Sequence, residues 1–230
     1  SIESSGKEYL FAVSDWMDRH LSDKNSSISL MGEVKKLHKK MQSLDEHFAE
    51  KFERLYENME ETNNLVHSVL LGDENDEAEN PAFAALFIGE GRAAVLNMGD
   101  CRVSLLRGGA LRQLSTDYKK AERLLKMGII NDEQAEVLAD RLGASSHGSQ
   151  TGVRRAEQFA VRSGDLFILY NRGLLEYVDE EKFLEITADS GDCDQTANGL
   201  VREALHNGAR SDITVMVVKI EEAGAADEPV

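Results

Sequence analysis

Glycine turns divide the stretch after Pro81 into short runs of strand-forming residues. These runs are Phe83–Ile88, Arg92–Met98, Arg102–Arg107 and Ala110–Leu114. Gly89-Glu90-Gly91 separates the first pair and Gly108-Gly109 separates the second, and glycine supplies the backbone conformations that tight hairpins need. The pattern predicts an antiparallel meander over residues 82–115. A chain with this much antiparallel strand is not an all-helical bundle.

Apolar residues at a spacing of three and four precede the predicted meander. They predict amphipathic helices over Lys7–Leu21, Ser29–Gln42 and Leu44–Leu71, so that helices occupy residues 7–71. Ser43 followed by Glu46 fits a capping box, which separates the last two helices.

The apolar positions between Val34 and Leu70 also fit the seam of a coiled coil. The step from Phe48 to Phe52 interrupts the heptad, however, and aromatic side chains suit a helix that lies on a sheet. Packing on a sheet is the favoured interpretation. A helical coiled-coil interaction module remains the alternative.

Helices and strands alternate in the rest of the chain. Residues 117–152 are expected to hold two helices, Asp117–Met127 and Asp132–Leu142, the second capped by Asn131, and then a glycine- and serine-rich loop. Residues 157–220 are expected to hold strands Glu157–Val161, Leu166–Tyr170 and Ile213–Ile220, and helices Asp179–Ala188 and Asp194–Asn207. This order predicts a single α+β domain over residues 1–220, with antiparallel sheets packed face to face and helices outside, followed by an acidic tail over 221–230.

The composition limits the kinds of partner and the cellular compartment that we expect for this chain. The net charge of −16 disfavours nucleic acid, because such a chain repels a phosphate backbone. Two cysteines, Cys101 and Cys193, are too few for a disulfide framework, which favours the cytoplasm. No apolar run reaches the roughly 20 residues of a membrane helix, so no membrane partner is expected.

Five passages resemble one enzyme family. The most specific is Gly99-Asp100-Cys101-Arg102 between two strands, followed by Gly108-Gly109. It is similar to the "strand, Gly-Asp-Ser-Arg, strand, Gly-Gly" passage of the type 2C (PPM) protein phosphatases. The others follow in the family's order: Leu111–Asp117, the flap-like Met127–Ala135, Ser163–Leu174 and Ala209–Val215. The resemblance covers most of the chain and implies a PPM-phosphatase-like β-sandwich flanked by helix pairs, with residues 117–152 as the flap.

The resemblance also implies a metal requirement. The family holds two Mg²⁺ or Mn²⁺ ions, mostly through aspartates, and the ions generate the attacking hydroxide. Ser1–Ser5 would stand where the family's Asp-Gly-Met-Gly-Gly motif ends. The aspartate of that motif, the preceding Asn-Glu-Asp strand and the arginine that grips phosphate are therefore expected to be missing, which leaves the fold incomplete at its N-terminus.

Two matched positions carry replacements. Arg172 stands at the aspartate of the family's Ser-Asp-Gly, and Ser211 stands at the metal-binding aspartate of the closing Asp-Asn-Ile-Thr-Val. Asp212 could substitute only if the strand register slips by one, because neighbouring strand residues point to opposite faces. Asp100 keeps the position at which relatives help to hold a weaker third ion, but one carboxylate alone rarely makes a metal site, and an aspartate that caps the bend between two strands is the favoured interpretation. We expect Arg172 to fill the emptied site and to pair with Asp100 or Asp212.

These replacements predict a degenerate type 2C phosphatase-like domain, a pseudophosphatase without an intact catalytic set. Its role would be to bind a protein partner or phosphoprotein, or to regulate another domain, without a cofactor. The alternative is an active metal-dependent serine/threonine phosphatase that uses Mg or Mn to dephosphorylate phosphoproteins.

Overall fold

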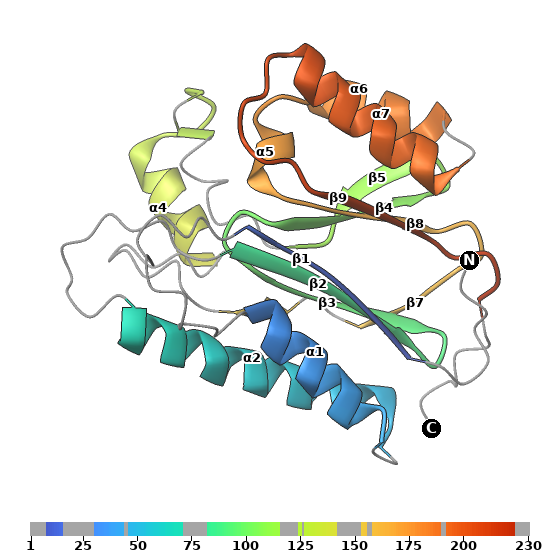
Figure 1. Cartoon of the computed structure of the whole chain (residues 1–230). Helices are drawn as coiled ribbons and strands as arrows, with labels where there is room; N and C mark the ends of the chain where they lie inside the picture. Colours follow the sequence, from blue (N-terminus) through green and yellow to red (C-terminus); the bar gives the residue numbers. More distant parts are fainter. Residues whose placement is uncertain are drawn as a thin grey trace.

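The computed structural model describes residues 8–15, 30–43, 46–70, 82–115, 124–125, 127–141, 153–155, 158–189 and 192–223. Two antiparallel sheets pack face to face, and helices cover their outer faces (Figure 1). The α+β class predicted from the sequence is confirmed. Within the described residues, no helix is both long and apolar enough to cross a bilayer.

The first sheet begins with a strand where a helix was expected. Its order is β1 (Tyr9–Asp15), β2 (Ala82–Gly89), β3 (Arg92–Met98) and β6 (Arg154–Arg155), with β7 (Phe159–Ala160) also paired to β3. The predicted helix Lys7–Leu21 is therefore wrong over the residues of β1. The run Tyr-Leu-Phe-Ala-Val is short and rich in aromatic and branched residues, and such a run fits either structure until a partner strand decides. Here β2, buried along its whole length, is that partner.

The second sheet has the order β5 (Ala110–Gln113), β4 (Arg102–Arg107), β8 (Leu166–Tyr170) and β9 (Val215–Lys219). The chain passes from one sheet to the other through residues 99–101, where Gly99 has a φ of 64°. The predicted strands of residues 82–115 are confirmed, but their single meander is wrong. They form two hairpins, β2–β3 and β4–β5, and each hairpin belongs to a different sheet.

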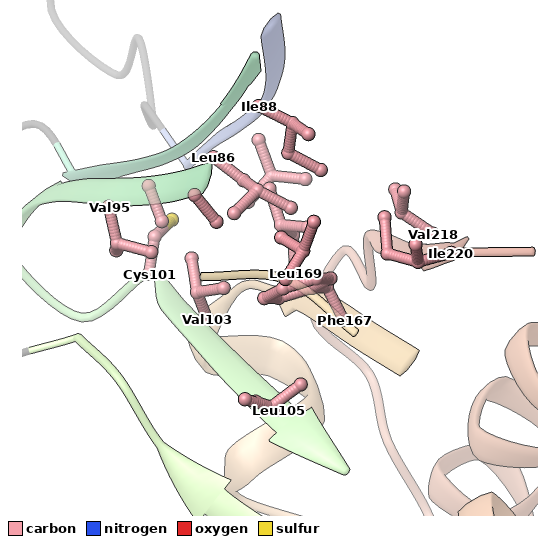
Figure 2. Packing of buried hydrophobic residues seen from close by; sticks show 14 of the residues in the cluster. Leu86, Ile88, Val95, Cys101, Val103, Leu105, Phe167, Leu169, Val218 and Ile220 are labelled. Carbon is pink, nitrogen blue, oxygen red and sulfur yellow. The ribbon is translucent and has the colours of Figure 1, made fainter. Parts of the chain in front are cut away.

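Apolar side chains from both sheets meet between them and form the central core (Figure 2). Leu86 and Val95 contribute from the first sheet, and Val103, Phe167 and Leu169 contribute from the second. All five are almost completely buried. This core fixes the relative position of the strand ends that carry polar residues.

Two helices, α1 (Leu30–Met41) and α2 (Phe48–Leu70), cover the first sheet (Figure 1). Their apolar stripe packs on β2 and β3, and the Phe48 and Phe87 rings stack with centroids 4.8 Å apart. The members of the stripe that are buried in this way are Val34, Met41, Phe48, Phe52, Leu55 and Met59. The structure thus contradicts the coiled-coil alternative over this part of the seam, because the stripe is already covered by the chain's own sheet.

The helix ends differ from the predicted capping box. The Ser43 hydroxyl donates to the Lys40 carbonyl at the end of α1, at 2.7 Å, instead of capping α2. Glu50 accepts from the His47 backbone N–H at 3.1 Å, one residue before α2 begins. The second helix therefore starts at Phe48 and not at Leu44.

Helices α6 (Glu180–Asp189) and α7 (Cys193–His206) cover the second sheet, and a short helix, α5 (Arg172–Leu175), follows β8 directly. Helix α7 ends before Gly208, whose φ is 87°, as predicted. Helix α4 (Asp132–Arg141) also forms as predicted. Most of the predicted helix Asp117–Met127, the loop 143–152 and the tail from residue 224 lie outside the described residues.

Candidate functional site

Four polar residues reach the same end of the sandwich from four separate strand boundaries. Asp15 ends β1, Asp100 lies between β3 and β4, Asn171 follows β8, and Asp212 precedes β9. The register brings these boundaries together, because Asp15 is opposite Ala82 at the start of β2, and Tyr170 is opposite both Arg102 and Val215. Figure 1 shows the end of β1 close to α5. We take this end of the sandwich as the candidate site.

Asn171 is the centre of the site. Its side-chain amide nitrogen donates to the Asp15 carboxylate at 3.2 Å and to the Asp212 backbone carbonyl at 2.9 Å. Its side-chain oxygen accepts from the Thr214 backbone N–H at 3.0 Å. Asn171 is only 1% exposed, so these contacts satisfy a buried amide. We call this set of contacts the Asn171 bridge, which joins β1 in one sheet to the segment before β9 in the other.

Gly173 allows the bridge to form. A Cβ atom at this position would lie 2.2 Å from the Asp212 backbone oxygen and 3.2 Å from the Ser211 hydroxyl. Only glycine lets the start of α5 approach the main chain of residues 211–212 this closely. The glycine of the predicted Asn171-Arg172-Gly173 match is therefore required by packing.

Arg172 is directed along its own helix. Its guanidinium Nε donates to Glu176 at 2.7 Å, four residues later, and both side chains are nearly half exposed. The pairing with Asp100 or Asp212 that we expected stays a prediction, and the pair with Glu176 is an additional contact of Arg172. An exposed pair of this kind contributes about 0.3–0.5 kcal/mol to helix stability.

Ser211 and Asp212 are both exposed and lie before the first residue of β9. The closing strand is shorter than predicted, so the rule that neighbouring residues point to opposite faces does not apply to Asp212. The contact that Asp212 makes with the Asn171 bridge comes from its backbone carbonyl.

Cys101 is a buried cysteine near Asp15 and Asp100. Burial raises the pKa of its thiol, and the nearby negative charges of Asp15 and Asp100 raise it further. A thiol in this setting stays protonated at neutral pH and is not a nucleophile.

The residues that the structure describes at this end do not fit a centre of two divalent cations. Among the described residues, no group of three or more histidine, cysteine or acidic side chains is arranged to hold a metal ion. The Asp15 carboxylate is engaged by a neutral amide, and the next residue after that amide is a cation. Hard cations such as Mg²⁺ and Mn²⁺ need several oxygen ligands of the opposite charge.

Asp15 is the site residue that the sequence reasoning missed. The signal was available, because Asp15-Trp16-Met17-Asp18 follows a strand-like run and can be set against the Asp-Gly-Met-Gly-Gly motif that was expected to be missing. The helix prediction over Lys7–Leu21 concealed this match. With β1 in place, the aspartate of the motif has a counterpart, whereas its first glycine is replaced by Trp16.

A pocket of about 440 Å³ lies near the other end of β1, away from the candidate site. Lys51, which is 7% exposed, pairs there with Glu8 at 2.8 Å. Burial lowers the pKa of His38 in its wall, and the charge of Glu8 opposes this shift. We regard this pocket as a packing feature between β1, α1 and α2.

No protein-family model matches the chain. The protein phosphatase PhpP of Streptococcus pneumoniae is 29% identical over 170 residues, which are 73% of this chain and 68% of PhpP. The serine/threonine phosphatase stp of Listeria monocytogenes is 27% identical over 143 residues, 59% of this chain and 54% of that protein.

Solved structures show the same fold. PppA, described as a key regulatory component of T6SS in Pseudomonas aeruginosa, superimposes with a TM-score of 0.66 at 22% identity and covers 91% of this chain and 85% of its own. The catalytic domain of the serine/threonine phosphatase PstP was solved with two manganese ions. It superimposes with a TM-score of 0.63 at 21% identity, and the match covers 94% of this chain and 92% of the PstP chain.

Proposed function

Since the chain is a relative of the type 2C serine/threonine phosphatases, we propose that it uses their fold as a regulatory, protein-binding module and does not hydrolyse phosphoesters. The observation that carries this proposal is the pair Asn171-Arg172. A neutral amide engages Asp15, and a permanent cation stands where the resemblance places a metal-binding aspartate.

The charge at residue 172 has the wrong sign for a metal ligand. Two unit charges about 4 Å apart interact by about 4 kcal/mol at an effective dielectric constant near 20. Replacing an aspartate with an arginine removes such an attraction to a dication and adds a repulsion. The Glu176 pair offsets part of this repulsion, but it supplies no ligand at the site.

The lost ligands are not replaced by their neighbours. Ser211 is a hydroxyl, and Asp212 contacts the Asn171 bridge through its main chain. The Asn171 bridge joins the two sheets through a neutral side-chain amide. Regulation through protein contacts is the role that such a fold retains, and phosphoproteins are among the partners we propose.

The test is phosphatase activity of the purified protein with any residues that its gene encodes before Ser1. We expect no Mn²⁺-dependent turnover of p-nitrophenyl phosphate or of a phosphothreonine peptide, and no difference when EDTA is added. Robust turnover that EDTA abolishes would overturn the proposal and would establish the enzyme alternative, with Mg or Mn as cofactor.

A further inference from the structure

A short turn before α4 is fixed at both of its ends. At its start, the Ile129 N–H bonds to the Leu124 carbonyl at 3.0 Å, and the Gly128 N–H bonds to the Leu125 carbonyl at 2.9 Å. With Gly128 at a φ of 70°, this is the Schellman arrangement that ends a helix.

At the end of the turn, Asn131 caps α4. Its side-chain oxygen accepts from the Gln134 N–H at 2.8 Å, and the Gln134 side chain accepts from the Asn131 N–H at 3.1 Å. This reciprocal pair is a capping box. Two caps within eleven residues therefore hold residues 127–131 in a defined conformation.

The turn presents large apolar side chains to solvent. Met127 is 65% exposed and Ile129 is 60% exposed, and Val137 on α4 is 51% exposed. Together with Leu205 on α7, they are the large hydrophobic residues found exposed among those described. Three of these four thus fall within residues 127–137. A rigid display of this kind costs little entropy when a partner binds, because its side chains are attached to an ordered backbone.

Acidic residues adjoin this apolar group. Asp132 and Glu133 are exposed in the first turn of α4, and Glu133 shares a helix face with Val137, four positions later. The chain as a whole carries a net charge of −16. An approaching segment would therefore meet apolar surface bordered by carboxylates, and a basic segment is steered toward it.

We propose that this corner, comprising Met127, Ile129, Asp132, Glu133 and Val137, docks a basic amphipathic segment of a partner protein. The apolar side chains contact the apolar face of the segment, and the two carboxylates pair with its lysine or arginine residues. The inference deepens the proposed function, since it names the surface and the kind of partner for a protein-binding module.

The experiment uses a fluorescein-labelled amphipathic helical peptide of leucine and lysine as the probe, and anisotropy as the readout. We expect saturable binding that weakens with salt. The double variant M127Q/I129Q should bind at least tenfold more weakly, and D132N/E133Q should lose most of the salt dependence. Leu205→Gln is the matched control, because Leu205 is 58% exposed but lies on α7; it should change the affinity less than twofold.

Equal losses for L205Q and M127Q/I129Q, or the absence of binding, would overturn the docking site. So would a concentration-dependent dimer mass that M127Q/I129Q abolishes, because the surface would then be occupied by a second copy of the chain. Circular dichroism of each variant establishes that it is folded. The outcome is separate from that of the phosphatase assay: turnover there would overturn the proposed function and leave this surface intact.

Discussion

A carboxylate lies at each end of β8, and the two carboxylates accept hydrogen bonds from different kinds of group. At the start of β8, the Asp165 side chain is 1% exposed. It accepts hydrogen bonds from Nε and from a terminal nitrogen of Arg107, at 2.7 and 2.6 Å. The bond to Asp165 raises the pKa of Arg107. At the other end of β8, the Asp15 carboxylate accepts from the neutral side-chain amide of Asn171 at 3.2 Å.

One end of β8 therefore carries an ion pair, and the other carries a contact between a carboxylate and a neutral amide. Arg107 neutralises Asp165 with two parallel bonds, the geometry in which a guanidinium binds a carboxylate most strongly. The Asn171 bridge instead joins the strand ends through a neutral amide.

The largest effect is expected from Arg107→Ala. The variant leaves a buried Asp165 without its counter-charge, which should lower the free energy of unfolding by about 3 kcal/mol. Urea denaturation followed by circular dichroism measures this. Arg112→Ala is the control, because Arg112 also lies over the Phe159 ring, at 5.7 Å against 5.8 Å for Arg107. If both variants lose the same stability, the ring contact and not the ion pair is responsible.

A smaller loss is expected from Asn171→Ala. It removes the amide from buried surroundings and leaves the Thr214 N–H without its acceptor, which should cost about 2 kcal/mol. Asn198→Ala is a suitable control, since Asn198 is an exposed asparagine that donates to the Asp194 carbonyl within α7. Its loss should stay below about 0.5 kcal/mol. Equal losses would mean that the Asn171 bridge does not join the sheets.

The smallest effect concerns the thiol beneath Asp15. Burial and the charges of Asp15 and Asp100 raise the pKa of the Cys101 thiol. Its reaction with Ellman's reagent at pH 8 should therefore be limited by the rate at which the protein unfolds, and not by deprotonation of the thiol in the folded protein. Cys193, which is partly exposed, should react first. In a Cys193→Ser variant, rapid labelling of Cys101 under native conditions would show that this end of the sandwich opens freely.

The sequence predicted the strands best where local signals agree with tertiary pairing. Strands β3, β4 and β8 have the predicted bounds, because glycines or a terminal polar residue delimit continuous apolar runs. The β1 strand was missed because its choice of strand over helix depends on β2, some 70 positions later in the chain. The β2–β3 and β4–β5 hairpins were predicted to form one meander, because no local pattern shows that the chain passes from one sheet to the other at residues 99–101.

The candidate site was only partly predictable for a similar reason. The motif match singled out Asn171, Arg172 and Gly173, and the structure adds the close packing of Gly173 against Asp212. The match did not predict which residue each of these side chains would contact. Arg172 found Glu176 one helical turn away, and Asn171 found Asp15, 156 positions distant, a pairing that only the three-dimensional fold brings within reach.

The most direct test of the proposal that this chain holds no divalent metal is the melting temperature with and without Mn²⁺. A ligand raises the melting temperature only if it binds the folded state. We predict no change for the natural sequence at millimolar Mn²⁺, and a rise for the variant R172D/S211D, which restores a carboxylate at both replaced positions. A rise of several degrees for the natural sequence, reversed by EDTA, would contradict the account.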